Sequence, residues 1–397
     1  SGWQTWSPLA GNWWATRTNA DGTGGAQAVP LPAGNCGIAT PCSWSTILAA
    51  FPDAKIYGRF LLKAGSNWLG FDGNAAADTI GVEGSPFVAD TARRDQAHSP
   101  HVATVVTYDF EPETDCTLDC YVNAATGNDA FGGDTPASAK KTVQAAVNQV
   151  STGGTVHVAA GTYTENVTVA KDDVTIDGAG IGSTVLQGTS CGGTGIAITG
   201  NRSGITLTDM TITGFNYGIT TGNIGNTVSD ILIQDLSASQ NCVHGIWFQA
   251  GDTTNLVLRR VTANGNGGAG GRGFWMINGT KTDVTIEDGT FSSNALVGID
   301  VSHGNVTGLS IARNTVTGNG DSGIGVLGPK GMGANTVVSN TVTNNGRFGI
   351  EIKIPTGNGL ESGGGSIVVR ENTVSRTVDA TDVRDHAGIA VFRRSVG

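Results

Sequence analysis

The stretch Gly298-Ile-Asp-Val301 occurs again, with small changes, as Gly323-Ile-Gly-Val326 and Gly349-Ile-Glu-Ile352. Further copies are Gly195-Ile-Ala-Ile198, Gly245-Ile-Trp-Phe248, Gly273-Phe-Trp-Met276 and Gly388-Ile-Ala-Val391, with Gly218-Ile-Thr-Thr221 as a weaker copy. Their first apolar residues, 196, 219, 246, 274, 299, 324, 350 and 389, are separated by 23, 27, 28, 25, 25, 26 and 39 residues. Self-similarity at a nearly constant period indicates a solenoid.

The apolar residues within each repeat alternate with a period of two, which predicts strands and not helices. Three short strands and three turns fit into about 25 residues, and stacking such coils pairs each strand in parallel with its neighbours. The sequence therefore predicts an all-β fold, a right-handed single-stranded parallel β-helix. We expect glycine to supply left-handed turn conformations, and Asn314, Asn340 and Asn372 to form a ladder of side-chain amides at one corner.

The composition agrees with a chain of many turns and few charges. Of 397 residues, 61 are glycine and only 14% are charged, but the 11 prolines and the absence of a three-residue period exclude collagen. No run of 18 apolar residues exists, so the sequence predicts no membrane span. The formal net charge is −10 and no basic face is evident, which argues against binding to nucleic acid.

A change in composition near residue 115 predicts two domains. We expect a partial β-sandwich at residues 1–113, a disulfide-bearing linker at 114–120, and the β-helix at 121–397. An apolar pattern at Val143, Ala146, Val147 and Val150 predicts a capping helix over residues 136–150, with Pro136 in its first turn.

The second region also resembles the pectate-lyase-like β-helix superfamily. The resemblance is carried by the opening Tyr121-Val, the capping helix and the stretch Gly153-Gly-Thr-Val-His-Val-Ala-Ala-Gly-Thr-Tyr163. It implies the fold and leaves the activity open, because this superfamily includes lyases, hydrolases, epimerases, adhesins and phage tailspikes. The sequence lacks the polygalacturonase set of Asn-Thr-Asp, Asp-Asp, Gly-His-Gly and Arg-Ile-Lys, the pectate-lyase Arg-x-Pro-x-x-Arg, and the epimerase Tyr-Asp-Pro-Gly.

The first region resembles the second half of a jelly-roll module of the concanavalin and laminin-G type, found in exported bacterial proteins. Trp3-Gln-Thr-Trp6, Phe51-Pro-Asp-Ala-Lys-Ile56 and Phe71-Asp-Gly-Asn74 carry this resemblance. The first half of such a sandwich is missing, so we expect either a processed chain or a partner that completes the sheets.

Six cysteines outside any zinc-binding spacing suggest an oxidising compartment, and hence a secreted or cell-surface protein. Cys36 with Cys42, and Cys116 with Cys120, would close short loops. Cys191 and Cys242 lie two repeats apart, which places directly stacked Cα atoms about 9.6 Å apart, beyond disulfide range. A bond between them would need an irregular turn at Cys191-Gly-Gly, so this pairing stays open.

Candidate functional residues come from the position between the two inward apolar residues of each repeat, because its side chain points outward. This position holds Trp247, Trp275, Asp300 and Glu351, and two residues further along the strands lie Gln249 and Lys353. Tryptophan rings beside carboxylates suit a sugar-binding groove, with Trp247, Trp275 and Gln249 contacting the glycan.

The same strip gives the catalytic alternatives. Asp300 and Glu351, two rungs apart, would lie about 9 to 10 Å apart, near the upper end of the carboxylate separation in inverting glycosidases. Lys353 could instead be the base of a β-elimination, with a neighbouring Arg or a cation neutralising the uronate. A solvated sheet face with two stacked tryptophans is the structural alternative.

Calcium is the one cofactor that the sequence suggests. Asp72, Asn74 and Asp78 could hold it in the sandwich, and Asp379, Asp382 and Asp385 in the last long interval. His244 and His303 each precede a glycine, and we expect them to be hydrogen-bonded surface residues at turns.

Our prediction from the sequence is a secreted or cell-surface structural or adhesive β-helix protein that contacts glycans. The incomplete sandwich and an uncapped last repeat suggest that it associates head to tail with itself or docks to a surface partner. The alternative is a polysaccharide lyase or glycoside hydrolase acting on an extracellular, uronate-containing polysaccharide through Asp300, Glu351 and Lys353.

Overall fold

The computed structural model describes residues 115–375, with gaps at 224, 250, 269, 303, 329–334 and 357–365, then residues 387–395, and four short strands near the start of the chain. The chain divides into two units, residues 1–112 and 113–397. In the first unit, β1 (Trp14–Arg17) pairs antiparallel with β2 (Gln27–Pro30), and β3 (Leu62–Ala64) pairs antiparallel with β4 (Asn67–Leu69). The rest of the predicted sandwich lies outside the described residues.

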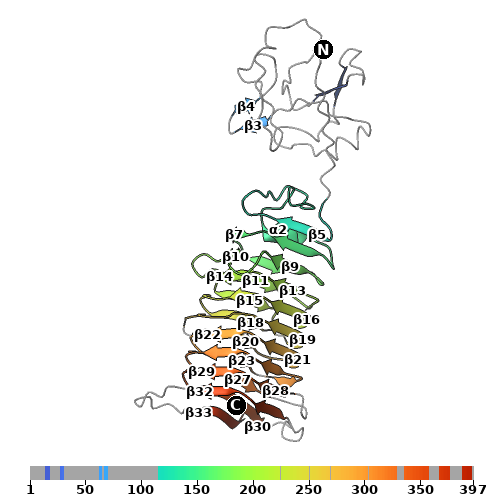
Figure 1. Cartoon of the computed structure of the whole chain (residues 1–397). Coiled ribbons are helices and arrows are strands. Elements are labelled where there is room, and N and C mark those ends of the chain that lie inside the picture. Colours follow the sequence, from blue (N-terminus) through green and yellow to red (C-terminus); the bar gives the residue numbers. More distant parts are fainter. Residues whose placement is uncertain are drawn as a thin grey trace. The chain divides into compact units, whose positions relative to one another are not determined.

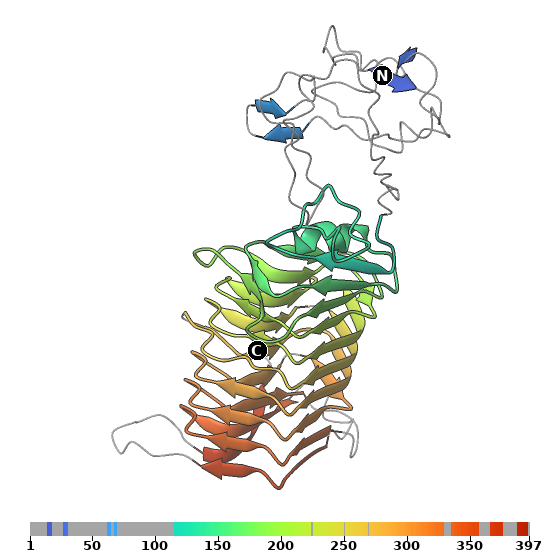
Figure 2. The same ribbon diagram turned by 45° about the horizontal axis from the view of Figure 1, so that its top comes forward.

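The second unit is a parallel β-helix whose rungs stack one on another and form three faces (Figures 1 and 2). The nine-stranded sheet contains β8 (Val167–Val169), β11 (Thr194–Ile198), β15 (Tyr217–Thr221), β18 (His244–Phe248), β20 (Phe274–Met276), β23 (Ile299–Val301), β27 (Ile324–Leu327), β30 (Phe348–Thr356) and β33 (Ala387–Ser395). The twelve-stranded sheet contains β5 (Asp119–Val122), β6 (Thr155–Val158), β9 (Thr175–Gly178), β12 (Arg202–Ser203), β13 (Thr206–Thr208), β16 (Thr227–Gln234), β19 (Asp252–Arg259), β21 (Thr280–Glu287), β24 (Asn305–Thr307), β25 (Ser310–Ala312), β28 (Asn335–Val338) and β31 (Ile367–Arg370).

The third face is made of two four-stranded sheets. One contains β7 (Gly161–Tyr163), β10 (Thr184–Gln187), β14 (Thr211–Thr213) and β17 (Ser237–Ala238), and the other β22 (Thr290–Ser292), β26 (Thr315–Thr317), β29 (Thr341–Thr343) and β32 (Thr373–Ser375). Thr262 connects them through parallel bridges to Ser237 and Thr290. The described part of the second unit therefore confirms the predicted β-helix.

The register of the nine-stranded sheet is the one predicted by the repeated tetrapeptide. Its first apolar residues lie side by side in consecutive strands, in the order Ile196, Ile219, Ile246, Phe274, Ile299, Ile324, Ile350 and Ile389. All of them up to Ile350 are almost fully buried. Each such side chain removed from water contributes roughly 1.5–3 kcal/mol, so this column forms much of the core.

Glycine supplies left-handed turns as predicted, for example at Gly214, but the glycines that open the repeats serve a different purpose. Gly245 and Gly323 are not in the left-handed region. They are needed because the neighbouring rung is close. A Cβ on Gly245 would lie 2.6 Å from the Ala238 carbonyl oxygen, and one on Gly323 would lie 2.6 Å from the Asn345 amide.

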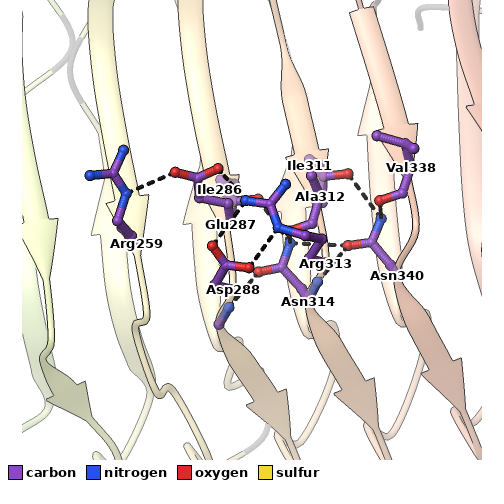
Figure 3. A network of polar contacts seen from close by, with 11 residues as sticks. Arg259, Ile286, Glu287, Asp288, Ile311, Ala312, Arg313, Asn314, Val338 and Asn340 are labelled. Atoms are coloured by element: carbon purple, nitrogen blue, oxygen red, sulfur yellow. Dashed lines mark hydrogen bonds and ion pairs between the residues drawn. The ribbon is translucent and has the colours of Figure 1, made fainter.

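Residues other than glycine hold one corner in the left-handed region and form an ionic network (Figure 3). Asp288 and Arg313 occupy this corner in successive rungs with φ values of 57° and 56°. The Arg313 guanidinium donates to both carboxylate oxygens of Asp288 at 2.7 and 2.9 Å and to Glu287 at 2.6 Å, while Arg259 donates to Glu287 at 2.8 Å. The hydrogen bonds of Arg259 and Arg313 lower the pKa of Glu287. Each arginine of this network therefore connects two adjacent rungs.

Two ladders of asparagine amides run along the axis. The predicted one is confirmed: the Nδ2 of Asn314 donates to Asn340 at 3.0 Å, and that of Asn340 to Asn372 at 2.9 Å (Figure 3 shows the first step). A second ladder, which the sequence reasoning missed, passes through Asn241, Asn266, Asn294, Asn319 and Asn345. In both ladders each amide also serves the backbone of adjacent rungs, as in Asn294 N to Asn319 Oδ1 at 3.0 Å.

The capping helix is shorter than predicted. It is α2 (Val143–Gln149), with Thr142 as its N-cap, and not 136–150, because Lys140 pairs with the free edge of β5 through a bridge to Val122. The side-chain amide of Gln144 pairs with Thr168 in β8, accepting from its N–H at 2.6 Å and donating to its carbonyl oxygen at 3.3 Å. These contacts satisfy strand edges that would otherwise be open.

Two disulfides lie in the described residues, and no described cysteine is free. Cys116 pairs with Cys120 as expected. Cys191 pairs with Cys242, with a Cα–Cα distance of 5.7 Å and not the 9.6 Å of direct stacking. The reason is an irregular turn in which Ser190, Cys191 and Gly193 all have left-handed backbone, so the turn departs from the regular rung. Cys36 and Cys42 lie outside the described residues.

The last described strand leaves apolar side chains open to solvent. Ile389 and Val391 of β33 are 49% and 63% exposed. The described part of the chain contains no helix with the length and apolar character needed to cross a membrane.

The second asparagine ladder predicts a large cost for removing one of its members. Asn294→Ala would leave the backbone N–H and the Nδ2 of Asn266 without their shared acceptor, in a fully buried place. We expect the free energy of unfolding to fall by about 2–4 kcal/mol, measured by chemical denaturation. The control Thr315→Ala, at an exposed position in β26, should cost less than about 1 kcal/mol. Equal losses in the two variants would contradict a structural role of the ladder.

Candidate functional site

The predicted outward strip exists on the nine-stranded sheet. In register, Trp247 lies beside Trp275, Trp275 beside Asp300, Asp300 beside Gly325, and Gly325 beside Glu351. Lys353 lies two residues beyond Glu351 on the same strand, β30. Asp300 and Glu351 are thus two rungs apart, which corresponds to about 9.6 Å between their backbones.

The two tryptophans face each other and are not open platforms for sugars. Their rings stack with centroids 5.4 Å apart and an angle of 6° between the planes. Tyr217 packs on Trp247 at 4.9 Å, and the Arg272 guanidinium lies over the Trp275 ring at 4.2 Å. We therefore revise the predicted role of these rings: their faces stiffen the strip, and only their edges are available to a ligand.

Arg272 and Asp300 form an ion pair next to this column. The Arg272 Nε donates to Asp300 Oδ2 at 2.8 Å, and the two side chains are 20% and 14% exposed. Burial raises the pKa of the Asp300 carboxyl, against the opposing effects of Arg272 and of a hydrogen bond with Ser302. Ser302 also accepts from Trp275 Nε1 at 3.1 Å, so the carboxyl and the indole are held in one network.

Glu351 and Lys353 form the second ion pair. Lys353 Nζ lies 2.9 Å from Glu351 Oε2, and Ser322 Oγ donates to the same oxygen at 3.1 Å. The Glu351 side chain is only 6% exposed, whereas Lys353 is 26% exposed and is the more accessible member of the pair.

A pocket of about 120 Å³ separates the two ion pairs. Gly325 forms part of its lining, with Arg272, Trp275, Asp300 and Ser302 from the preceding rungs and Lys353 from the following rung. Gly325 has neither a left-handed backbone nor a crowded Cβ position, since the nearest atom to an added Cβ is Asp300 Oδ1 at 3.6 Å. Glycine inside a strand often marks a place where something else approaches the backbone closely.

His244 lies beneath the aromatic column and is buried, not on the surface as we expected. It is 4% exposed, and its Nδ1 accepts the backbone N–H of Arg272 at 3.2 Å. Its ring meets Trp247 and Trp275 edge-on, with centroids 5.2 and 4.9 Å apart. Burial, together with the nearby Arg272 cation, lowers the pKa of His244 to about 4, so the imidazole is neutral at pH 7.

The structure brings some predicted site residues together and separates others. Trp275, Asp300 and Lys353 line the pocket, whereas Trp247, Gln249 and Glu351 do not, although Glu351 is paired with Lys353. The sequence reasoning missed Arg272, and it placed Ser302 and Gly325 on the outward strip without giving them a role. Arg272 and Ser322 both stand immediately before a repeat glycine, a corner position that aligns from rung to rung and could have been examined like the outward position.

The predicted calcium ligands, Asp72, Asn74, Asp78, Asp379, Asp382 and Asp385, lie outside the described residues, and so does His303. Within the described ranges no three His, Cys, Asp or Glu side chains are grouped so that they could hold a metal ion.

Filling the pocket at Gly325 should stabilise the protein. Gly325→Ala places a methyl group at ordinary contact distance in a strand, so we expect the free energy of unfolding to rise by about 0.5–1 kcal/mol. Gly323→Ala, two residues earlier, is the matched control and should destabilise, because its Cβ would lie 2.6 Å from Asn345 and from Val342. Denaturation of both variants tests this, and a destabilised Gly325→Ala would show that the fold itself requires glycine there.

The buried histidine predicts a pH dependence of stability. The pKa of His244 is about 4 in the folded protein and has its ordinary value of 6.5 in the unfolded chain. Between these two pH values the unfolded state therefore binds more protons than the folded state. The contribution of His244 to the free energy of unfolding is therefore fully present above pH 6.5, and it falls by about 3 kcal/mol as the pH drops to 4. Unfolding free energies of the wild type and His244→Gln across this window measure the effect. An identical pH slope in the two proteins would contradict it.

Known proteins resemble this chain in their fold. The family model described as "right handed beta helix region" matches residues 157–307. No curated protein matches the sequence. Among solved structures, the chain is similar to the ORF18 protein of Geobacillus virus E2, at 15% identity and a TM-score of 0.41 over 64% of this chain, and it spans 58% of that protein.

Two polysaccharide lyases are also similar in structure. Pectate lyase Pel9A has 13% identity and a TM-score of 0.48, over 69% of this chain and 79% of its own. The alginate lyase from Paenibacillus sp. str. FPU-7 has 15% identity and a TM-score of 0.37, over 70% of this chain and 98% of its own. The parallel strand pairing and the matched family model lead to one conclusion: the described solenoid is a right-handed parallel β-helix.

Proposed function

We propose that this chain binds an extracellular polysaccharide on the nine-stranded sheet, with one sugar residue entering the pocket over Gly325. The observation that carries this proposal is the pocket itself. A strand interior favours a side chain that packs, yet the strand carries only Gly325 between Trp275, Asp300 and Lys353, where a Cβ would make ordinary contacts without a clash.

The surrounding groups suit a sugar ligand. The partly exposed charged side chains of the pocket can donate hydrogen bonds to sugar hydroxyl groups and accept hydrogen bonds from them. The edge of the Trp275 indole offers an apolar contact. Ion pairs and stacked rings hold these groups in place before the ligand arrives, which reduces the entropy lost on binding.

An extracellular location is part of the proposal. Both disulfides of the described residues, Cys116–Cys120 and Cys191–Cys242, support it, because such bonds persist in oxidising compartments.

Cleavage of the bound polysaccharide is a second candidate, favoured by the environment of Asp300. Its carboxyl has a raised pKa, which suits a proton donor, and Glu351 lies two rungs away across the pocket region. This arrangement fits an inverting hydrolysis, with Glu351 activating water. A β-elimination of a uronate with Lys353 as base fits less well, because Lys353 is paired with Glu351 and Arg272 with Asp300.

A panel of neutral and uronate polysaccharides tests the proposal. Binding is measured by affinity electrophoresis, and cleavage by new reducing ends and by the ultraviolet absorbance of unsaturated ends. We expect at least one polysaccharide to bind, and Lys353→Ala and Gly325→Val to weaken it by about tenfold or more, or about 1.4 kcal/mol. Arg259→Ala, on the twelve-stranded sheet, is the control and should bind like the wild type.

Binding that is unaffected by both pocket variants, or no binding to any polysaccharide, would contradict the proposed site. Cleavage that is lost in Glu351→Gln would add catalysis to the proposed function.

Head-to-tail association remains a prediction from the sequence. The exposed Ile389 and Val391 of β33 support it, because a strand from another chain that paired there would cover them. Sedimentation of concentrated protein measures it directly.

A further inference from the structure

The charges around the pocket over Gly325 cancel in pairs. Arg272 is held by Asp300 at 2.8 Å, and Lys353 is held by Glu351 at 2.9 Å. The pocket therefore contains two cations, but each already has a carboxylate partner within the protein.

These carboxylates are not free to move into solvent. Glu351 is 6% exposed and is also fixed by Ser322, and Asp300 is 14% exposed and is also fixed by Ser302. A carboxylate of a ligand that took over Lys353 or Arg272 would leave one of these buried groups without its counter-charge. Such an uncompensated buried charge is strongly unfavourable.

We propose, on the basis of the proposed function, that the pocket takes a neutral sugar residue and selects against a uronate. A hydroxymethyl or ring hydroxyl group can donate to Asp300 or accept from Lys353 while both ion pairs remain intact. A carboxylate at the same place meets Asp300 and Glu351 as like charges. The two acidic residues thus determine specificity by neutralising the cations of the site.

Glu351 is the residue that separates the two sugar classes most sharply. It is paired with Lys353, and loss of its negative charge would leave the Lys353 ammonium group at the pocket without a counter-charge. The isosteric Glu351→Gln keeps an acceptor for Ser322 and Lys353 but takes away the negative charge. This variant should turn the site toward uronates.

The experiment compares polymers that differ only in the group at C6. Two matched pairs are used: polygalacturonate with its carboxyl-reduced form, and a soluble β-1,4-glucan with its C6-oxidised form. Affinities for the full chain are measured by isothermal titration calorimetry at one fixed ionic strength, because screening alters charge effects. We expect the neutral member of a bound pair to bind the wild type about tenfold more tightly or better.

Glu351→Gln should shift the ratio of the two affinities by about tenfold or more toward the acidic member. The matched control is Glu287→Gln, which removes a carboxylate of the same kind from the ion-pair network of the twelve-stranded sheet. Its affinity ratio should equal that of the wild type. Thermal unfolding of both variants confirms that they are folded.

The outcomes distinguish this inference from the proposed function. If the acidic member of a pair binds the wild type more tightly, and pocket variants weaken it, polysaccharide binding stands and the selection for neutral sugars is overturned. An unchanged ratio in Glu351→Gln overturns the role of Glu351 in the same way. If neither member of either pair binds, the inference is overturned, and the proposed function fails with it only when no other polysaccharide of the panel binds.

Discussion

Parallel pairing between successive rungs is the interaction on which the rest of this β-helix depends. It requires each rung to repeat the path of the previous one, because a shift of one residue would turn every inward side chain outward. The almost fully buried column from Ile196 to Ile350 and the two asparagine ladders fix the same register by different means. The apolar column acts without direction, whereas each amide has specific donors and acceptors and so excludes a slipped pairing.

The same constraint builds the site. Because the inward side chains form the core, the outward side chains of consecutive strands align in straight columns and are not needed to pack the core. A side chain in one rung is then placed against its counterpart in the next at strand spacing. Trp247 on Trp275 is a side-chain contact of this kind, and the gap at Gly325 is a missing member of the same column. The pocket exists because Gly325 has no side chain in a column whose neighbouring positions carry large side chains.

Much of the fold could be predicted from the sequence because the repeat is visible in it. The column from Ile196 to Ile389 and the ladder beginning at Asn314 follow directly from spacing. The helix start could not be placed, because the pairing of Lys140 with β5 is a tertiary contact that overrides the local pattern. The bond between Cys191 and Cys242 was undecidable, since it depends on a turn that departs from the repeat.

The site was predicted less completely, for a physical reason. Asp300, Glu351 and Lys353 stand on the regular outward face, where alternation alone places them. His244, Arg272 and Ser322 stand at corners, where alternation gives no direction and only the path of the turn decides. Gly325 was visible as a variant of the repeat, but its meaning requires knowing that a methyl group would fit there.

The constant rung spacing also fixes the position of the pocket along the solenoid axis. Each rung advances the chain by about 4.8 Å along the axis, and in both asparagine ladders the same amide-to-amide hydrogen bond joins each rung to the next. Insertion or deletion of one complete rung between α2 and β11 would therefore move the pocket along the axis in fixed steps while its own contacts stayed the same. The distance between the capping helix and the pocket is therefore set by the number of rungs between them. Duplication of the gene segment that encodes one rung can change this number without altering the cap or the site.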